Sequence, residues 1–152
     1  MKRAYWIAAA VLCLCLFAAA PKTDLGSLQP VQLVQVTSSG PMVHLRTDTG
    51  LYGEGVDFGA ALGDMYRTAP GQVFLETADF LLVTPVTVKV LPELRQVLRP
   101  GTEVALISGL VDGTEAAQFL SARSGGVPLR KAGEHTVLPR LNMKGERYVL
   151  EE

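Results

Sequence analysis

The chain has no cysteine after residue 15, because Cys13 and Cys15 both lie in its first apolar segment. Disulfides and zinc sites with cysteine ligands are therefore excluded from the rest of the sequence. Basic residues are not in excess either: 14 Lys and Arg stand against 15 Asp and Glu, for a net charge of -1. A nucleic-acid-binding surface needs a basic footprint, so we expect no nucleic-acid partner.

Side chains suited to catalysis are also scarce. The histidines are His44 and His135, and no Gly-x-Ser-x-Gly nucleophile elbow occurs. A histidine on a strand face is more often half-buried for packing than catalytic. Carboxylate chemistry through Glu54, Asp57 or Glu76 stays open, but such side chains are usually solvated. These observations favour a protein that is not an enzyme and that uses no cofactor.

The first 30 residues have the composition of an export segment followed by a tether. Met1-Lys2-Arg3 is a short positive start, and residues 4–20 then contain no charge and no strongly polar group. This order is typical of a signal peptide or a signal anchor, which we assign to residues 1–20. Residues 21–30 are mixed and polar, which predicts a short tether.

The fate of this leader stays open between cleavage, retention and lipidation. Ala18-Ala19-Ala20 offers the small residues that a signal peptidase requires, whereas Pro21 obstructs an extended substrate strand. Cys13 and Cys15 could carry a lipid, although leucine precedes each of them where a small residue is usual. We expect the protein at the outer face of the cytoplasmic membrane, or secreted if the leader is cleaved.

Residues 31–123 are predicted to form one α/β domain. Strand and helix periodicities alternate along it and are separated by Gly, Pro and Asp signals. We expect a mixed sheet of about four to five strands with an N-terminal hairpin and about three packed helices. The expected strands cover 31–37, 42–47, 73–75 with 80–83, and 104–108; the expected helices cover 58–66, 91–98 and 115–123.

Residues 124–152 are predicted to be a C-terminal arm. Ser124-Gly125-Gly126 interrupts the pattern, and the basic residues that follow are spaced among apolar and acidic ones. That spacing favours a solvated arm over a patch that binds anionic lipid. Residues 148–150 could add a short edge strand.

Gly53, Glu54, Gly55 and Asp57 form the candidate ligand or partner loop. Two glycines around one residue suit a backbone that bends or adopts positive φ, and Asp57 can cap the helix that follows. A phosphate-binding loop would need further glycines or a Lys-Ser/Thr pair, and the two carboxylates would repel an anion. The spacing of Asp48 from these carboxylates does not match a calcium-binding EF-hand loop, so we predict no metal site.

A family resemblance follows from the order of several short motifs. They are Gly53-Glu54-Gly55, Phe58-Gly59-Ala60-Ala61-Leu62, Val73-Phe74-Leu75, Phe80-Leu81-Leu82-Val83, residues 94–100, Val104-Ala105-Leu106-Ile107 and the helix at 114–120. This order resembles the N-terminal domain of the Ger(x)C family, the C subunits of spore germinant receptors, over roughly residues 31–123.

The resemblance implies an exported lipoprotein on the outer face of the spore inner membrane, working with membrane-embedded partners. Thr77 stands near the place where the family usually shows a histidine, and the family's large C-terminal part does not follow. The resemblance therefore implies a shortened relative.

We expect an exported, membrane-proximal, non-catalytic interaction domain in spore germination or sporulation. Its expected partners are membrane-embedded proteins, with the membrane itself contacted through the N-terminal segment. One alternative is an exported small-ligand-binding domain that uses the ends of the parallel strands. A hydrolase is a second and less favoured alternative.

Overall fold

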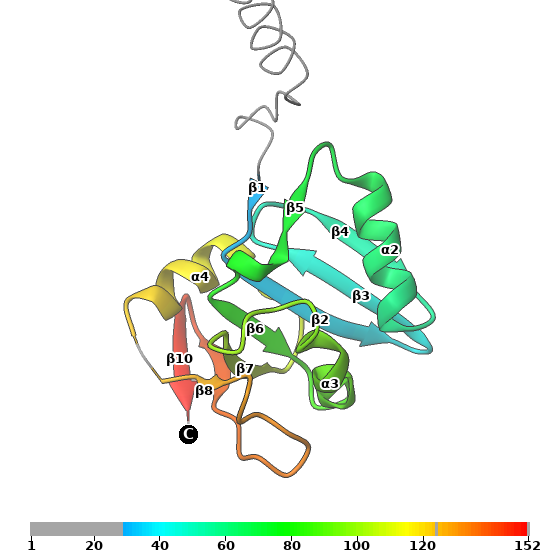
Figure 1. Ribbon diagram of the computed structural model, residues 1–152. Coiled ribbons are helices and arrows are strands. Elements are labelled where there is room, and N and C mark those ends of the chain that lie inside the picture. The colour runs from blue at the N-terminus through cyan, green and yellow to red at the C-terminus, as the bar shows by residue number, and fades with distance from the viewer. Residues whose placement is uncertain (1–28, 124, 152) are drawn as a thin grey trace, which may run out of the picture.

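The computed structural model describes residues 29–123 and 125–151 (Figure 1). The predicted leader and most of the predicted tether lie outside the described residues. Within the described part of the chain, no helix is both long enough and apolar enough to cross a bilayer. The elements are β1 (Gln29–Pro30), β2 (Leu33–Ser39), β3 (Met42–Thr47), β4 (Tyr52–Gly55), α2 (Phe58–Thr68), β5 (Val73–Phe74), η2 (Leu75–Thr77), β6 (Phe80–Val83), η3 (Thr87–Val90), α3 (Leu91–Leu94), β7 (Glu103–Ile107), α4 (Gly113–Ser121), β8 (Val127–Pro128), β9 (Arg140–Lys144) and β10 (Arg147–Glu151).

One mixed sheet of eight strands carries the fold, in the order β10-β9-β7-β6-β2-β3-β4, with β8 paired to β7 (Figure 1). Neighbours from β9 to β2 are parallel, whereas β3, β4 and β10 are antiparallel to their partners. The strands β1 and β5 form a separate parallel pair. The predicted mixed α/β class, the N-terminal hairpin and the three helices are confirmed. The expected four to five strands were too few.

The two faces of the sheet bury two separate cores. Leu81 and Val83 of β6 belong to the first core, under α2 and α3, whereas Phe80 and Leu82 belong to the second, under α4. Each of these four side chains is at most 7% exposed. Both faces of β6 are therefore covered, as the sequence predicted, and this explains why its apolar run is uninterrupted.

The helix expected over residues 91–98 is shorter in the structure. The α-helix α3 ends at Leu94, and the amides of Gln96 and Val97 then bond three residues back, to Glu93 and Leu94. Such tighter turns commonly close a helix, and they still place Leu98 in the first core. Apolar spacing therefore predicted the buried residues correctly but not the helix end.

The segment after residue 124 is part of the sheet and not a solvated arm. The strand β9 pairs with β7, and β10 pairs with β9 through a two-residue turn at Gly145, whose φ is +64°. Leu129, Ala132 and Leu138 enter the first core, while Leu141 enters the second. The sequence did not predict these contacts, because each is made by a single apolar residue among polar ones and fills a gap between distant elements. Such isolated residues show no strand or helix period.

Candidate functional site

The candidate loop at Gly53-Glu54-Gly55 is the edge strand β4. Neither glycine has a positive φ. A Cβ added at Gly53 would lie 2.2 Å from the carbonyl oxygen of Ala61, and one at Gly55 would lie 2.5 Å from the Ala61 amide nitrogen. The prediction of a bent loop was therefore wrong: these glycines allow the backbone of α2 to lie directly against β4.

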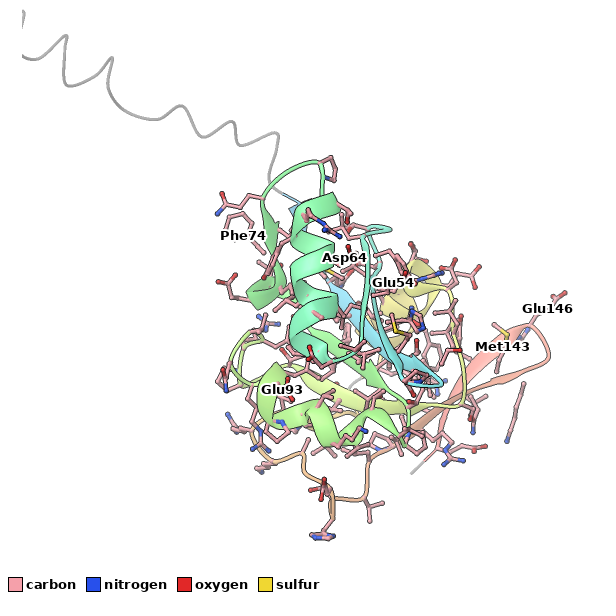
Figure 2. The ribbon with its side chains drawn as sticks, turned by 90° about the vertical axis from the view of Figure 1, so that its right-hand side faces the viewer. Glu54, Asp64, Phe74, Glu93, Met143 and Glu146 are labelled. Atoms are coloured by element: carbon pink, nitrogen blue, oxygen red, sulfur yellow. The ribbon has the colours of Figure 1, made fainter. Side chains whose placement is uncertain are left out.

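Helix α2 also closes the outer edge of β4. The Glu54 amide donates to Oδ2 of Asp64 at 3.2 Å, and the Thr68 hydroxyl lies 3.3 Å from the carbonyl of Tyr52. Figure 2 shows Glu54 and Asp64 close together on these two elements. The hydrogen bond from Arg67, followed by the Glu54 amide, holds the pKa of Asp64 below its usual value. An edge strand whose groups are occupied is a poor template for a partner strand.

The Glu54 side chain points to the opposite face of the sheet and joins a hydrogen-bonded chain there. The Tyr52 hydroxyl donates to Oε2 of Glu54 at 2.7 Å and lies 2.8 Å from Nδ1 of His44. Because the phenol proton is used on Glu54, Nδ1 of His44 must be the donor to Tyr52. The hydrogen bond to Glu54 also raises the pKa of Tyr52. Arg46 lies over the Tyr52 ring at 5.4 Å.

This polar cluster lines a shallow hollow of about 240 Å³ together with Thr37 and Leu110. The Glu54 carboxylate and the His44 imidazole both hydrogen-bond to the exposed Tyr52 hydroxyl. The arrangement is therefore that of a solvated sheet face. In the described residues, no group of three His, Cys, Asp or Glu side chains is placed to hold a metal ion.

Asp57 caps helix α2, as predicted. Its Oδ1 accepts the Ala60 amide at 2.7 Å, which satisfies one of the free amides of the first turn. The structure thus separates the four candidate residues: the two glycines are packing positions, Glu54 faces one side of the sheet, and Asp57 lies at the end of β4 beside a groove.

The groove beside Asp57 consists of two hollows that share Val86 and Lys89, and we call it the distal groove. The first hollow has about 300 Å³ and lies between the β2–β3 turn, the start of α2, and η3 with α3. The second has about 360 Å³ and lies between the segment after β6 and residues 134–138. Apolar side chains dominate the lining: Met42, Val43, Val56, Phe58, Val86 and Val90 in the first hollow, and Pro85, Val86, Val88, Leu106 and Leu138 in the second.

Two valines in this lining are unusually exposed: Val56 is 71% and Val86 is 62% exposed. The backbone that carries Val86 is fixed from below by Thr87, which is 1% exposed. The Thr87 hydroxyl donates to the Val36 carbonyl at 2.9 Å and accepts the Thr84 amide at 2.9 Å. The groove is therefore built on buried hydrogen bonds and presents its apolar side chains from a fixed position.

The distal groove lies at the carboxyl ends of β2 and β6, far from the point where the chain enters the domain. Residue 29 lies beside the start of β2, at the top of Figure 1, and α3 lies at the opposite end of the sheet. The seven residues of β2 span roughly 23 Å at about 3.3 Å per residue.

Sequence reasoning missed Val56 and Val86. A usable signal was present, because each is a β-branched residue beside a turn signal, outside any strand or helix period that would bury it. Comparison with protein-family models, curated proteins and solved structures gave no match. The groove is therefore interpreted from its own chemistry.

Proposed function

We propose that this protein is an exported, membrane-proximal interaction domain that docks onto membrane-embedded partner proteins through the distal groove. The observation that carries the proposal is the pair of exposed valines, Val56 and Val86, on a fixed apolar groove. Exposed apolar surface gathered in one hollow and rimmed by polar groups is typical of interaction sites. A role in spore germination or sporulation rests on the family resemblance of residues 31–123.

Covering this surface supplies part of the free energy of docking. Fully burying an exposed valine side chain contributes about 1.5 kcal/mol, so covering the exposed 71% of Val56 and 62% of Val86 supplies about 2 kcal/mol. The fixed backbone adds to the affinity, because a preformed site loses little conformational entropy on binding.

The charges at the rim indicate the chemistry of the partner segment. Asp57 and Glu93 border the first hollow with Lys89, so carboxylates outnumber ammonium groups there. Figure 2 shows Glu93 on α3, below the lower end of α2. We infer an apolar segment that carries a basic residue, from the part of the partner that projects out of the bilayer. Because the groove is at the far end of β2 from residue 29, the partner has to extend past the base of the domain.

Site-specific photo-crosslinking in the native cell tests this function. The full chain carries a photoreactive residue at position 86, where the exposed side chain tolerates replacement. We expect an adduct with an integral membrane protein and loss of that adduct when Val56→Asp is introduced, because a carboxylate would then face the apolar segment.

Position 66 supplies the matched control. Tyr66 is 47% exposed on α2 and lies outside the residues that line the groove. A probe at this position should give no adduct with the same protein, and Tyr66→Asp should leave the adduct from position 86 intact. Equal adducts from positions 86 and 66 would contradict docking through the groove.

A further inference from the structure

A further hollow, separate from those described above, lies at the carboxyl ends of β7 and β9, on the other face of the sheet from the distal groove. It has about 260 Å³ and is enclosed by the loop over residues 108–112 and by side chains of β9 and β10. We call it the Tyr148 pocket, after the β10 residue that lines it. In open α/β sheets, ligands bind beyond the carboxyl ends of parallel strands, where the strand-to-helix loops diverge.

In the present fold the loops after β6 and β7 diverge, and the loop after β7 forms one wall of this hollow. The segment after β6 leads to η3 and α3 over the first core, whereas the segment after β7 leads to α4 over the second core. The loop after β7 is held in place by Gln35, which is 1% exposed. Its amide nitrogen donates to the Val111 carbonyl at 2.9 Å, and its amide oxygen accepts the Val111 amide at 3.3 Å. One wall of the pocket is thus fixed before any ligand binds.

The Tyr148 side chain is the second and independent observation. The residue is 9% exposed, and its fully buried hydroxyl forms no hydrogen bond with any described residue. Burial raises the pKa of Tyr148, and the nearby amide of Asp112 lowers it without reaching hydrogen-bond geometry. A buried hydroxyl without a partner is costly, so such groups are rare in native proteins. A ligand that pairs with the hydroxyl removes this cost.

The lining sets the class of the ligand. Leu110, Val111, Leu141 and Met143 supply an apolar wall. Asp112 is among the lining residues, and the negative charge of its carboxylate disfavours an anion there. The Tyr148 hydroxyl donates a hydrogen bond more readily than it accepts one, so its partner is an acceptor oxygen. At about 30 Å³ for each water-sized group, the pocket holds roughly eight non-hydrogen atoms.

We propose that the Tyr148 pocket binds a small uncharged molecule that has an acceptor oxygen beside a short apolar body. The Tyr148 hydroxyl donates to that oxygen, and the leucine and methionine side chains cover the apolar body. Leu110 and Met143 are each 55% exposed and form the mouth. Rotation of such exposed side chains takes picoseconds to nanoseconds and opens the way to the hydroxyl. This binding is independent of docking through the distal groove.

The probe is N-butylacetamide, an uncharged amide of the required size, and the counter-probe is hexanoate, which matches it in size but carries a carboxylate. Both are titrated at neutral pH into the full chain with labelled methionine methyl groups, followed by NMR. We expect the amide to shift the Met143 methyl resonance saturably and hexanoate to shift it far less. The methyl of Met65, which is 0% exposed on the buried face of α2, should not move, and Met42 reports separately on the distal groove.

Two substitutions complete the test. Tyr148→Phe should weaken binding of the amide about tenfold, because it removes the donor and keeps the ring. Tyr66→Phe is the matched control, since Tyr66 is 47% exposed on α2 and should leave binding unchanged. The proposal is overturned if Met143 does not respond, if hexanoate binds as well as the amide, or if Tyr148→Phe binds the amide as tightly as the unaltered chain. An unmoved Met65 resonance in Tyr148→Phe verifies that the variant is folded.

Discussion

Replacing Gly53 by alanine should destabilise the domain strongly, although a glycine in a strand is ordinarily improved by a side chain. The new Cβ would lie 2.2 Å from the carbonyl oxygen of Ala61 and 2.7 Å from both the backbone nitrogen and the Cβ of Met65. Real Cβ contacts below 3.0 Å essentially do not occur, so α2 would have to move by about 0.8 Å, from 2.2 to 3.0 Å.

That movement would disturb the packing of the whole helix. Phe58, Ala61 and Met65 are its buried side chains, and each is at most 4% exposed. Overpacking of this kind costs about 1–3 kcal/mol, and we expect the upper end because backbone atoms are the obstacle. With total stabilities of about 5–15 kcal/mol for domains of this kind, a loss of about 3 kcal/mol is readily measured.

The matched control is Gly63→Ala on the same helix. Gly63 is exposed in the interior of α2, and a Cβ there would meet no atom within 4 Å. Alanine should therefore raise the free energy of unfolding by about 0.5–1 kcal/mol through helix propensity. Urea denaturation of both variants, analysed with a common m-value, compares their free energies of unfolding. A Gly53→Ala variant as stable as the unaltered chain would refute the close-packing account.

Three further predictions concern buried and edge polar groups. Gln35→Leu should lower the free energy of unfolding by about 2 kcal/mol in the same urea assay, because it leaves two partly buried backbone groups of the loop after β7 without partners. Tyr148→Phe should leave the free energy of unfolding unchanged or raise it by about 1 kcal/mol, since the lost hydroxyl has no partner; a marked loss of stability would show a hydrogen bond that the structure lacks. The pKa of Asp64, followed by NMR titration, should lie below its ordinary value, first because of Arg67 and then because of the Glu54 amide. A lowered pKa in the folded state means that the stabilisation is present above the unfolded pKa and is lost as pH falls through the folded pKa, so the protection factor of the Glu54 amide, which is corrected for the intrinsic exchange rate at each pH, should fall in acid and in Asp64→Ala at neutral pH. An ordinary Asp64 pKa would contradict this.

Local chemistry made part of the fold predictable. The cap at Asp57 follows from a carboxylate placed three residues before a free amide, and its hydrogen bond is present. The strands β6 and β7 were predicted because a run of apolar residues is needed wherever both faces of a sheet are covered.

The edge strand expected at residues 148–150 is present as β10, but β9 could not be found in this way. Within β9 only Leu141 is fully buried, so the segment shows no alternation that marks a strand. Its strand conformation depends on pairing with β7, more than 30 residues earlier in the chain. Such long-range pairing leaves little local signal.

The conformation of the candidate loop was predicted wrongly for a related reason. Glycine serves both positive φ and close backbone approach, and the sequence does not distinguish the two uses. At Gly53 and Gly55 the structure shows close approach. The distal groove was missed because Val43, Val56 and Val86 come from three separate segments that only the folded chain brings together.

Hydrogen–deuterium exchange of the full chain in its native membranes, compared with the same chain purified in detergent, tests the docking claim most directly. The account predicts that the amides around Val56 and Val86 exchange more slowly in the membranes, where a partner segment fills the groove. Slower exchange around His44 and Tyr52 instead, on the polar face of the sheet, would contradict it.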